Sequence, residues 1–213
     1  MSYHIVENFL EPDVFEKLKT KAQLLKKYAK LDDNTITGDH NVDTDQGYYE
    51  KYFRRNRVWR VRPLGSHYKT YIDNKDVSDM VLEFFGDELK LPLLSAKQFF
   101  ISRGLNEIML RNMWLQYTDK DSAVHRHIDG KIFSAPIEKS FTALIWCHEY
   151  WDIEWGAELK MIVDDQIITL NPKPNTFVAW TRETPHWVTP ITEKYNADTN
   201  PTRTMLGFSL YQY

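Results

Sequence analysis

Two histidines and one aspartate stand out because their side chains could hold a single metal ion. His127 and Asp129 are two residues apart, and His186 lies further along the chain in Thr-Pro-His-Trp. In an extended segment, residues i and i+2 point to the same side, so His127 and Asp129 can converge on one ion. Two imidazoles and a carboxylate on one face of an octahedron leave three positions open, a ligand set that suits iron(II) working with dioxygen. We therefore predict that His127, Asp129 and His186 are the metal ligands of a catalytic centre.

The prediction of a metal site rests on these residues taken together, because none of them is specific for such a site alone. A His-x-Asp pair arises by chance about once in every couple of sequences of this composition, and a lone histidine is more often a hydrogen-bonded structural residue. A fourth residue, Arg203, precedes the last predicted strand. Its always-charged guanidinium suits a buried dicarboxylate, which it can bind through two hydrogen bonds. Seen alone, Arg203 is equally compatible with a surface turn.

The elements that must position these residues are mainly strands after about residue 96. There, short apolar runs are bounded by Gly, Pro, Asn and Asp, a pattern typical of strands joined by turns. The strands that we predict cover residues 98–102, 108–117, 141–147, 159–163, 166–170, 176–181, 187–191 and 204–211. Many short strands favour a sandwich or barrel, and we expect a jelly roll, also called a double-stranded β-helix.

Helices are expected before that core. Apolar residues at helical spacing predict one helix from Pro12 to about Tyr28, and a second from about residue 76 to 85 that ends at Gly86. The length of 213 residues fits one domain. We therefore predict a single α+β domain over residues 1–213, mainly β with N-terminal helices. Its helical part, about 1–95, packs on a jelly-roll core of about 96–213.

Composition limits the partners and the compartment of the protein. The formal net charge is -3, so the whole-chain charge does not point to nucleic acid or an anionic membrane. The one cysteine, Cys147, cannot form a disulfide within the chain. The N-terminus lacks the charged start and apolar run of a signal peptide, and no apolar stretch approaches the roughly 20 residues of a membrane helix. We expect a cytoplasmic protein without a membrane partner.

Two stretches of the N-terminal part are polar or basic. Residues 32–47 contain several Asp and Asn and predict a long loop. Residues 54–62 are rich in arginine, and alternation places Arg60 and Arg62 on one face of a strand. Together with nearby tyrosines they could bind a phosphate backbone. A solvated strand whose arginines pair with the neighbouring acidic loop is the simpler interpretation.

Several segments of the chain match the motifs of a known family. They are residues 5–12, Leu-Gln-Tyr at 115–117 followed by His-Ile-Asp at 127–129, residues 151–159 with Gly-Ala-Glu-Leu, residues 172–180, and His-Trp-Val-Thr-Pro-Ile at 186–191. By these segments the chain resembles the prolyl-4-hydroxylase-like branch of the iron(II)- and 2-oxoglutarate-dependent oxygenases. The resemblance covers most of residues 3–211 and is weakest over 30–100.

This resemblance implies a role for each candidate residue. His127, Asp129 and His186 would bind iron(II). Arg203 would bind the distal carboxylate of 2-oxoglutarate, and Tyr117 would add a hydroxyl hydrogen bond to the same cosubstrate. The alternative for Tyr117 is a core tyrosine.

The reaction implied by the resemblance is a dioxygenase reaction. The substrate would be hydroxylated by dioxygen while 2-oxoglutarate is decarboxylated to succinate and carbon dioxide, and ascorbate is a further candidate cofactor. Because Asp129 fills the position that halogenating relatives leave empty, hydroxylation or hydroxylation-driven demethylation is expected.

The chain departs from the family pattern at three places. Ala157 stands where a second glycine is usual, and its small size predicts little consequence. Met205 stands where many relatives have a serine that helps to hold the cosubstrate, so the second hydroxyl must come from elsewhere or be absent. The segment from His186 to Arg203 is also longer than usual, and its extra residues, around 196–201, predict a loop. Arg203 keeps its role only if that loop folds back.

Other functions remain open at this point. A cupin site would use His125 and His127 with a glutamate a few residues later, but no glutamate lies there. A non-catalytic jelly-roll binding module would not need both the iron ligands and Arg203. Within the oxygenase chemistry, the substrate could be a prolyl or other protein residue, a small molecule or, least expected, a nucleobase. Loops 39–52 and 131–139, with Trp151 and Trp187, are expected to shape its pocket, and the oligomeric state is unknown.

Overall fold

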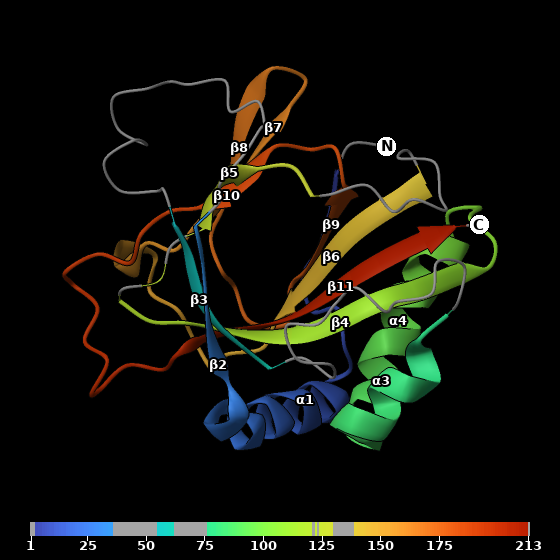
Figure 1. Cartoon of the computed structure of the whole chain (residues 1–213), viewed down its shortest axis with the longest axis horizontal. Coiled ribbons are helices and arrows are strands. Elements are labelled where there is room, and N and C mark those ends of the chain that lie inside the picture. Colours follow the sequence, from blue (N-terminus) through green and yellow to red (C-terminus); the bar gives the residue numbers. More distant parts are fainter. Residues whose placement is uncertain are drawn as a thin grey trace.

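The computed structural model describes residues 3–35, 55–61, 76–120, 122, 124–129 and 139–212. In these residues two antiparallel sheets pack against each other, and helices cover the larger one (Figure 1). The large sheet has the strand order β1-β9-β6-β11-β4-β3-β2, and the small sheet has the order β5-β10-β7-β8. Two packed sheets of this kind form the predicted jelly roll, mainly β with a few helices.

The elements have the following bounds. The strands of the large sheet are β1 (Tyr3–Val6), β2 (Lys30–Thr35), β3 (Arg55–Val61), β4 (Ile108–Thr118), β6 (Ser140–Trp146), β9 (Phe177–Thr181) and β11 (Arg203–Gln212). Those of the small sheet are β5 (Val124–His127), β7 (Leu159–Val163), β8 (Gln166–Leu170) and β10 (His186–Val188). The helices are α1 (Pro12–Leu25), α3 (Ser78–Phe85) and α4 (Lys90–Ile101), with short 3-10 turns η1 (Lys26–Tyr28), η3 (Asp87–Leu89) and η5 (Ile153–Trp155).

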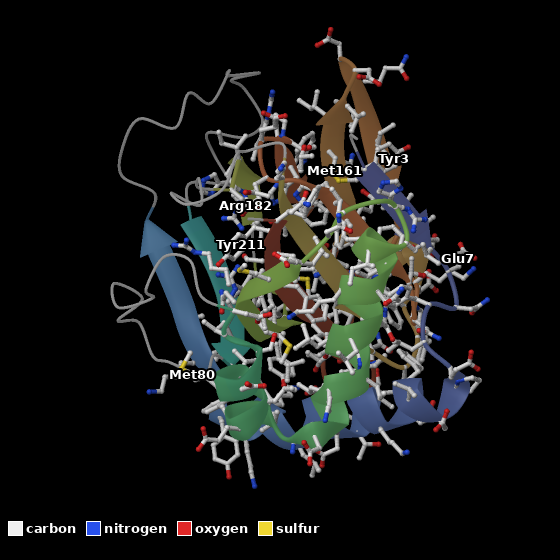
Figure 2. All side chains as sticks on the ribbon, turned by 90° about the vertical axis from the view of Figure 1, so that its right-hand side faces the viewer. Tyr3, Glu7, Met80, Met161, Arg182 and Tyr211 are labelled. Carbon is white, nitrogen blue, oxygen red and sulfur yellow. The ribbon has the colours of Figure 1, made fainter. Side chains whose placement is uncertain are left out.

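The helices cover the outer face of the large sheet, with α3 and α4 in front of it in Figure 2. Pro12 stands in the first turn of α1, where its missing N–H costs no helical hydrogen bond. Each helix buries one apolar side against the sheet. The buried residues include Leu18, Ala22, Val81, Phe85, Leu93 and Phe100. This layer is one hydrophobic core of the domain.

Strand β11 is central because it forms long ladders with both β4 and β6. Leu206, Phe208 and Leu210 belong to the core under the helices, whereas Met205 belongs to a second core between the sheets. Side chains alternate along a strand, so Arg203 shares the face of Met205 and points between the sheets. The start of β11 therefore delivers Arg203 to the interior of the jelly roll.

The structure confirms most of the predicted elements. The first helix is α1 with η1, and the second is α3, which ends at Gly86 with φ +93°. Two predicted strands, 159–163 and 166–170, coincide with β7 and β8. The strand predicted at 98–102 is wrong, because residues 90–101 form helix α4, which buries Leu93, Ala96 and Phe100 at helical spacing. None of the helices described is long and apolar enough to span a membrane.

The N-terminal part also contributes strands that were not predicted. These are β1, which pairs with β9, and β2, which pairs with β3. β3 falls within the strand predicted in the basic segment and pairs with β4. The loop predicted over 32–47 thus begins within β2, and its remainder after residue 35 lies outside the described residues. In the basic segment, Arg60 Nε donates to Gln116 Oε1 at 2.9 Å; Arg54 and Arg62 lie outside the described residues.

Candidate metal and cosubstrate site

The three predicted metal ligands meet at one place between the sheets. His127 ends β5 and His186 begins β10, and these two residues are direct partners in the β5–β10 ladder. Their ring centroids are 4.3 Å apart. Asp129 Oδ1 lies 3.8 Å from His127 Nε2, and Asp129 Oδ2 lies 3.8 Å from His186 Nε2. One ligand atom from each residue falls within a 4.8 Å cluster, which is the size of a single-ion site.

Both imidazoles are oriented by backbone carbonyl groups. His127 Nδ1 lies 2.7 Å from the carbonyl oxygen of His125, and His186 Nδ1 lies 2.9 Å from that of Thr184. These contacts favour the tautomer with the proton on Nδ1, which leaves the Nε2 lone pair facing Asp129. Burial, and then the nearby His186, lower the pKa of His127 from 6.5 to about 3. The His127 imidazole is therefore neutral near pH 7, as a metal ligand must be.

Asp129 lies beyond the end of β5 and is held by contacts with the large sheet. Its backbone N–H donates to the Arg182 carbonyl oxygen at 3.0 Å, and its Oδ2 accepts from the Thr142 hydroxyl. Burial raises the pKa of the carboxyl, but His186, Arg182, His127 and Thr142 outweigh it and bring the pKa down to about 2. The site thus presents an ionised carboxylate beside two imidazoles, a donor set that fits Fe(II).

Arg203 provides a buried cation in the same interior. Its side chain is 1% exposed, and NH1 donates to the Thr118 hydroxyl at 3.2 Å. Within the described part of the chain, its Nε and NH2 atoms are buried without a hydrogen-bond partner. Burial lowers the pKa of Arg203 to about 10, so the group remains charged near pH 7. Two unused donors on a buried guanidinium fit a carboxylate, which binds such a fork through two oxygens.

The long segment between His186 and Arg203 does fold back. Tyr195 stacks on Trp151 with ring centroids 5.4 Å apart, and it also makes an edge contact with Trp155. Its hydroxyl donates to the Pro201 carbonyl oxygen at 3.2 Å. This aromatic anchor lets the chain enter β11 with Arg203 paired to Thr118. The length of the segment therefore does not remove Arg203 from the site.

Tyr117 is not part of the site, contrary to the role that we predicted for it. Its hydroxyl donates to the Ala22 carbonyl oxygen of α1 at 2.5 Å, and its ring belongs to the core under the helices. Burial raises the pKa of this hydroxyl. Adjacent residues of β4 face opposite sides of the sheet, so Thr118 points to Arg203 and Tyr117 points away from it. Tyr117 is the core tyrosine of the alternative interpretation.

The other positions singled out in the sequence either support the site residues or lie apart from them. His125 orients His127 through its carbonyl group and is outside the cluster of three ligand atoms. Thr118 supplies the hydroxyl beside Arg203 that residue 205 lacks. Ala157 is buried with φ +57°, a conformation that favours glycine, so the departure there does have a conformational cost. Loop 39–52 and residues 131–138 lie outside the described residues.

Sequence reasoning missed Thr118, Thr142, Arg182 and Thr184. Each lies at a strand end or within two residues of one, and contacts a predicted site residue through a hydroxyl or a backbone carbonyl group. Threonine and arginine at strand ends are common, so residue type alone gave no signal for them. Thr118 could have been predicted only from the pairing of β4 with β11, which places it opposite Arg203.

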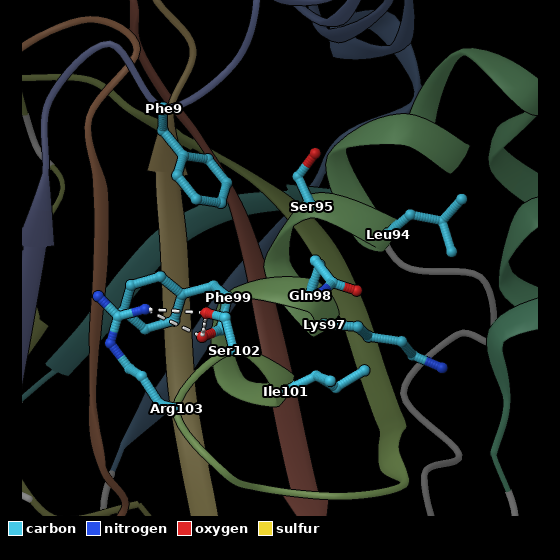
Figure 3. A pocket seen from close by; sticks show the side chains of 9 residues that line it. All are labelled: Phe9, Leu94, Ser95, Lys97, Gln98, Phe99, Ile101, Ser102 and Arg103. Carbon is cyan, nitrogen blue, oxygen red and sulfur yellow. Dashed lines mark hydrogen bonds between the residues drawn. The ribbon is translucent and has the colours of Figure 1, made fainter.

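A separate hollow lies on the helical side of the molecule (Figure 3). It has a volume of about 640 Å³ and is lined mainly by α4, with Phe9 at one side. The Arg103 guanidinium closes part of it, 3.6 Å from the centre of the Phe99 ring. No predicted site residue lines this hollow. The candidate metal site is therefore independent of it.

Comparison with known proteins agrees with this geometry. Residues 113–206, which include all three candidate ligands and Arg203, match the model of the 2OG-Fe(II) oxygenase superfamily. Among the curated proteins, none matches the sequence closely enough to count as a relative.

Solved structures share the fold at low sequence identity. A prolyl-4-hydroxylase from Pseudomonas putida is similar with a TM-score of 0.62 and 14% identity, over 100% of this chain and 93% of that one. A prolyl hydroxylase from Trichoplax adhaerens, solved with a peptide of hypoxia inducible factor, is similar with a TM-score of 0.58 and 12% identity, over 99% and 84% of the two chains. An oxidoreductase of the 2OG-Fe(II) oxygenase family from Burkholderia pseudomallei has a TM-score of 0.59 and 15% identity, over 100% and 86%. The chain is thus similar to the 2OG-Fe(II) oxygenase superfamily in sequence over residues 113–206, and it shares the fold of these solved structures.

Proposed function

We propose that this protein is an oxygenase, a hydroxylase in which His127, Asp129 and His186 hold Fe(II) and Arg203 anchors 2-oxoglutarate. The observation that carries the proposal is the pairing of two features in one interior. Three ligand atoms cluster within 4.8 Å, and a buried guanidinium has two donors without a partner in the described residues. A metal alone would not need the guanidinium, and a dicarboxylate alone would not need the three ligands.

The residues have separate tasks in such a reaction. Fe(II) with 2-oxoglutarate and dioxygen supplies the oxidising chemistry, and the products are succinate, carbon dioxide and a hydroxylated substrate. His127 presents a neutral imidazole, His186 offers a second ring nitrogen beside it, and Asp129 would balance the charge of the ion. Arg203, whose NH1 donates to the Thr118 hydroxyl, would hold the far carboxylate of the diacid and leave its keto-acid end for the metal. The packed interior keeps bulk water away.

For the substrate, we propose a protein residue or a small molecule. The family match over residues 113–206 supports this class, and the Pseudomonas and Trichoplax proteins of similar fold are prolyl hydroxylases. A nucleobase is less favoured. In the basic segment, Arg60 is engaged with Gln116 and Trp59 donates to Asp119 at 2.7 Å, so both side chains contribute to packing of the sheet. The single cysteine, Cys147, is a buried free thiol, which supports our proposal that the protein works in the reducing cytoplasm.

Turnover of 2-oxoglutarate without added substrate tests the proposal. Purified protein with Fe(II), ascorbate and 2-oxoglutarate should release succinate, measured by NMR, and Asp129→Ala should abolish that release. Asp198→Ala is the control, because Asp198 is an exposed carboxylate in the 192–202 segment. Unchanged succinate release by Asp129→Ala would refute the assignment of the metal site.

A further inference from the structure

Asp129 is the metal ligand with the least support from secondary structure. It follows β5, whereas His127 and His186 lie within paired strands. Its position depends on contacts from the large sheet: the Arg182 carbonyl oxygen receives its N–H, and the Thr142 hydroxyl donates to its Oδ2. A ligand on irregular backbone needs such supports to stay in place before the metal arrives.

Arg182 also supports the carboxylate through its side chain. Its NH1 donates to the Ser209 hydroxyl at 2.8 Å and lies 3.4 Å from the Thr142 hydroxyl oxygen. Thr142 and Ser209 are direct partners in the β6–β11 ladder. The Thr142 hydroxyl can therefore accept from Arg182 while it donates to Asp129. Arg182 thus fixes the rotation of the hydroxyl on which the carboxylate depends.

The turn that contains Arg182 also orients a second ligand. This turn joins β9 to β10, and its Thr184 carbonyl oxygen faces His186 Nδ1. The turn is closed by a hydrogen bond from Thr184 N to the Thr181 carbonyl oxygen at 3.0 Å. Arg182 N donates to Ser140 O at 3.0 Å, which ties the turn to β6. In Figure 2, Arg182, which follows β9, and Met161 of β7 lie higher in the view than Met80 of α3.

From these contacts we propose that Arg182 and Thr142 are positioning residues that hold Asp129 ready for the metal. They act through the carboxylate and do not contact the ion. The inference rests on the proposed function, because it assumes that Asp129 is a ligand. It predicts that removing the Thr142 hydroxyl weakens metal binding even though the three ligands remain.

The proposal is tested by measuring how tightly the metal-free protein binds Co(II) alone, with titration calorimetry. Thr142→Val keeps the shape of the side chain and should weaken Co(II) binding by about tenfold, the low end for loss of a ligand's supporting partner. Thr142→Ser retains the hydroxyl and should bind Co(II) like the wild type. Thr176→Val is the matched control, since Thr176 is buried at the other end of β9 and its hydroxyl has no partner among the described residues.

Arg182→Lys provides a second test, because lysine keeps the positive charge but lacks the guanidinium group that contacts Thr142 and Ser209. It should weaken Co(II) binding, and its effect should not add fully to that of Thr142→Val, because Arg182 acts through Thr142. Thermal unfolding of each metal-free variant shows whether it folds. If Thr142→Val folds and binds Co(II) like the wild type, the positioning role is refuted. If the wild type itself binds no Co(II), the proposed metal site fails instead.

Discussion

Arg203 is the residue whose surroundings most clearly demand a ligand. Its guanidinium is buried, and two of its donors lack partners in the described part of the structure. A buried charge without a partner destabilises a fold, and a carboxylate bound through two hydrogen bonds offsets that cost. In the proposed function, Arg203 would therefore contribute binding energy for 2-oxoglutarate at the expense of the stability of the empty protein.

Arg203→Met should separate these two effects. Loss of one partner of a buried charged pair costs about 2–5 kcal/mol of binding, so the KM for 2-oxoglutarate should rise roughly 30-fold or more. The empty protein should become more stable, because methionine fills similar space without a charge. Steady-state kinetics and urea unfolding without 2-oxoglutarate measure the two changes. A variant that binds 2-oxoglutarate normally and unfolds more easily would contradict the assignment.

Tyr117→Phe tests the correction made by the structure. Its hydroxyl donates to a carbonyl group of α1, so its removal should cost about 1 kcal/mol of stability. The KM for 2-oxoglutarate should remain that of the wild type, because the hydroxyl points away from Arg203. Urea unfolding and succinate formation check the two halves of this expectation. A rise in KM without loss of stability would return Tyr117 to the site.

Residue types allowed the sequence to predict part of the site. His127 and Asp129 combine distinctive chemistry with a short spacing, and the structure brings them together with His186. Arg203 is buried at the start of β11. The role predicted for Tyr117 was wrong because both faces of β4 are buried where the strand ends. Hydrophobic alternation there does not reveal which face a residue takes. Its neighbour Thr118 takes the face toward Arg203.

At the scale of elements, the segment before β11 determines whether Arg203 reaches the interior. The segment has no strand or helix of its own between Val188 and Arg203, and its Tyr195 packs between Trp151 and Trp155. Backbone hydrogen bonds restrain its first residues, including the bridge between Ile191 and Gly156, and the aromatic packing of Tyr195 restrains the part that follows.

Tyr195→Ala should damage both stability and cosubstrate binding. Loss of a buried aromatic ring costs roughly 3 kcal/mol or more, and the freed segment no longer holds the start of β11, so the KM for 2-oxoglutarate should rise. Tyr150→Ala is the control, because Tyr150 also contacts Trp155 but is half exposed. Thermal unfolding and kinetics of both variants measure the effects. An unchanged KM in a destabilised Tyr195→Ala protein would show that the anchor serves the fold alone.

The elements that the sequence predicted poorly share a physical cause. The apolar run at 98–102 suits a strand or a buried helix equally, and contacts made by α4 with α1 and β4 decide for the helix. β1 is short and pairs with β9, which lies far along the chain, and β2 is mostly polar, so local patterns give little sign of either strand. β7 and β8 were predicted well because a tight turn at Asp164 and Asp165 joins two alternating runs.

At the scale of the whole molecule, two cores meet at the large sheet. One lies under the helices and the other between the sheets, and buried titratable groups occur in and beside both. His148 is one of them: Nδ1 lies 3.2 Å from the Thr204 carbonyl oxygen and Nε2 lies 3.1 Å from that of Pro172. A neutral imidazole can donate to only one of these acceptors. Burial, and then the charge of Arg203, nevertheless lower the pKa of His148 to about 4.

This lowered pKa makes stability depend on pH in a definite direction. In the unfolded chain the histidine takes up a proton near pH 6.5, whereas in the folded protein it does so only near pH 4. Between these values the unfolded state binds more protons, so stability is complete above pH 6.5 and falls as the pH drops toward 4. The maximum loss from this one group is roughly 3 kcal/mol.

His148→Gln should flatten this dependence. Urea unfolding at several pH values between 4.5 and 7 should show a slope smaller by up to one proton, about 1.4 kcal/mol per pH unit. The slope is the informative quantity, because the variant also loses packing, which lowers stability at every pH alike. His127 has a lowered pKa of the same sign and is unchanged in the variant, so part of the dependence must remain. Equal slopes in the two proteins would mean that His148 carries its proton in the fold, donating to both carbonyl groups in spite of Arg203.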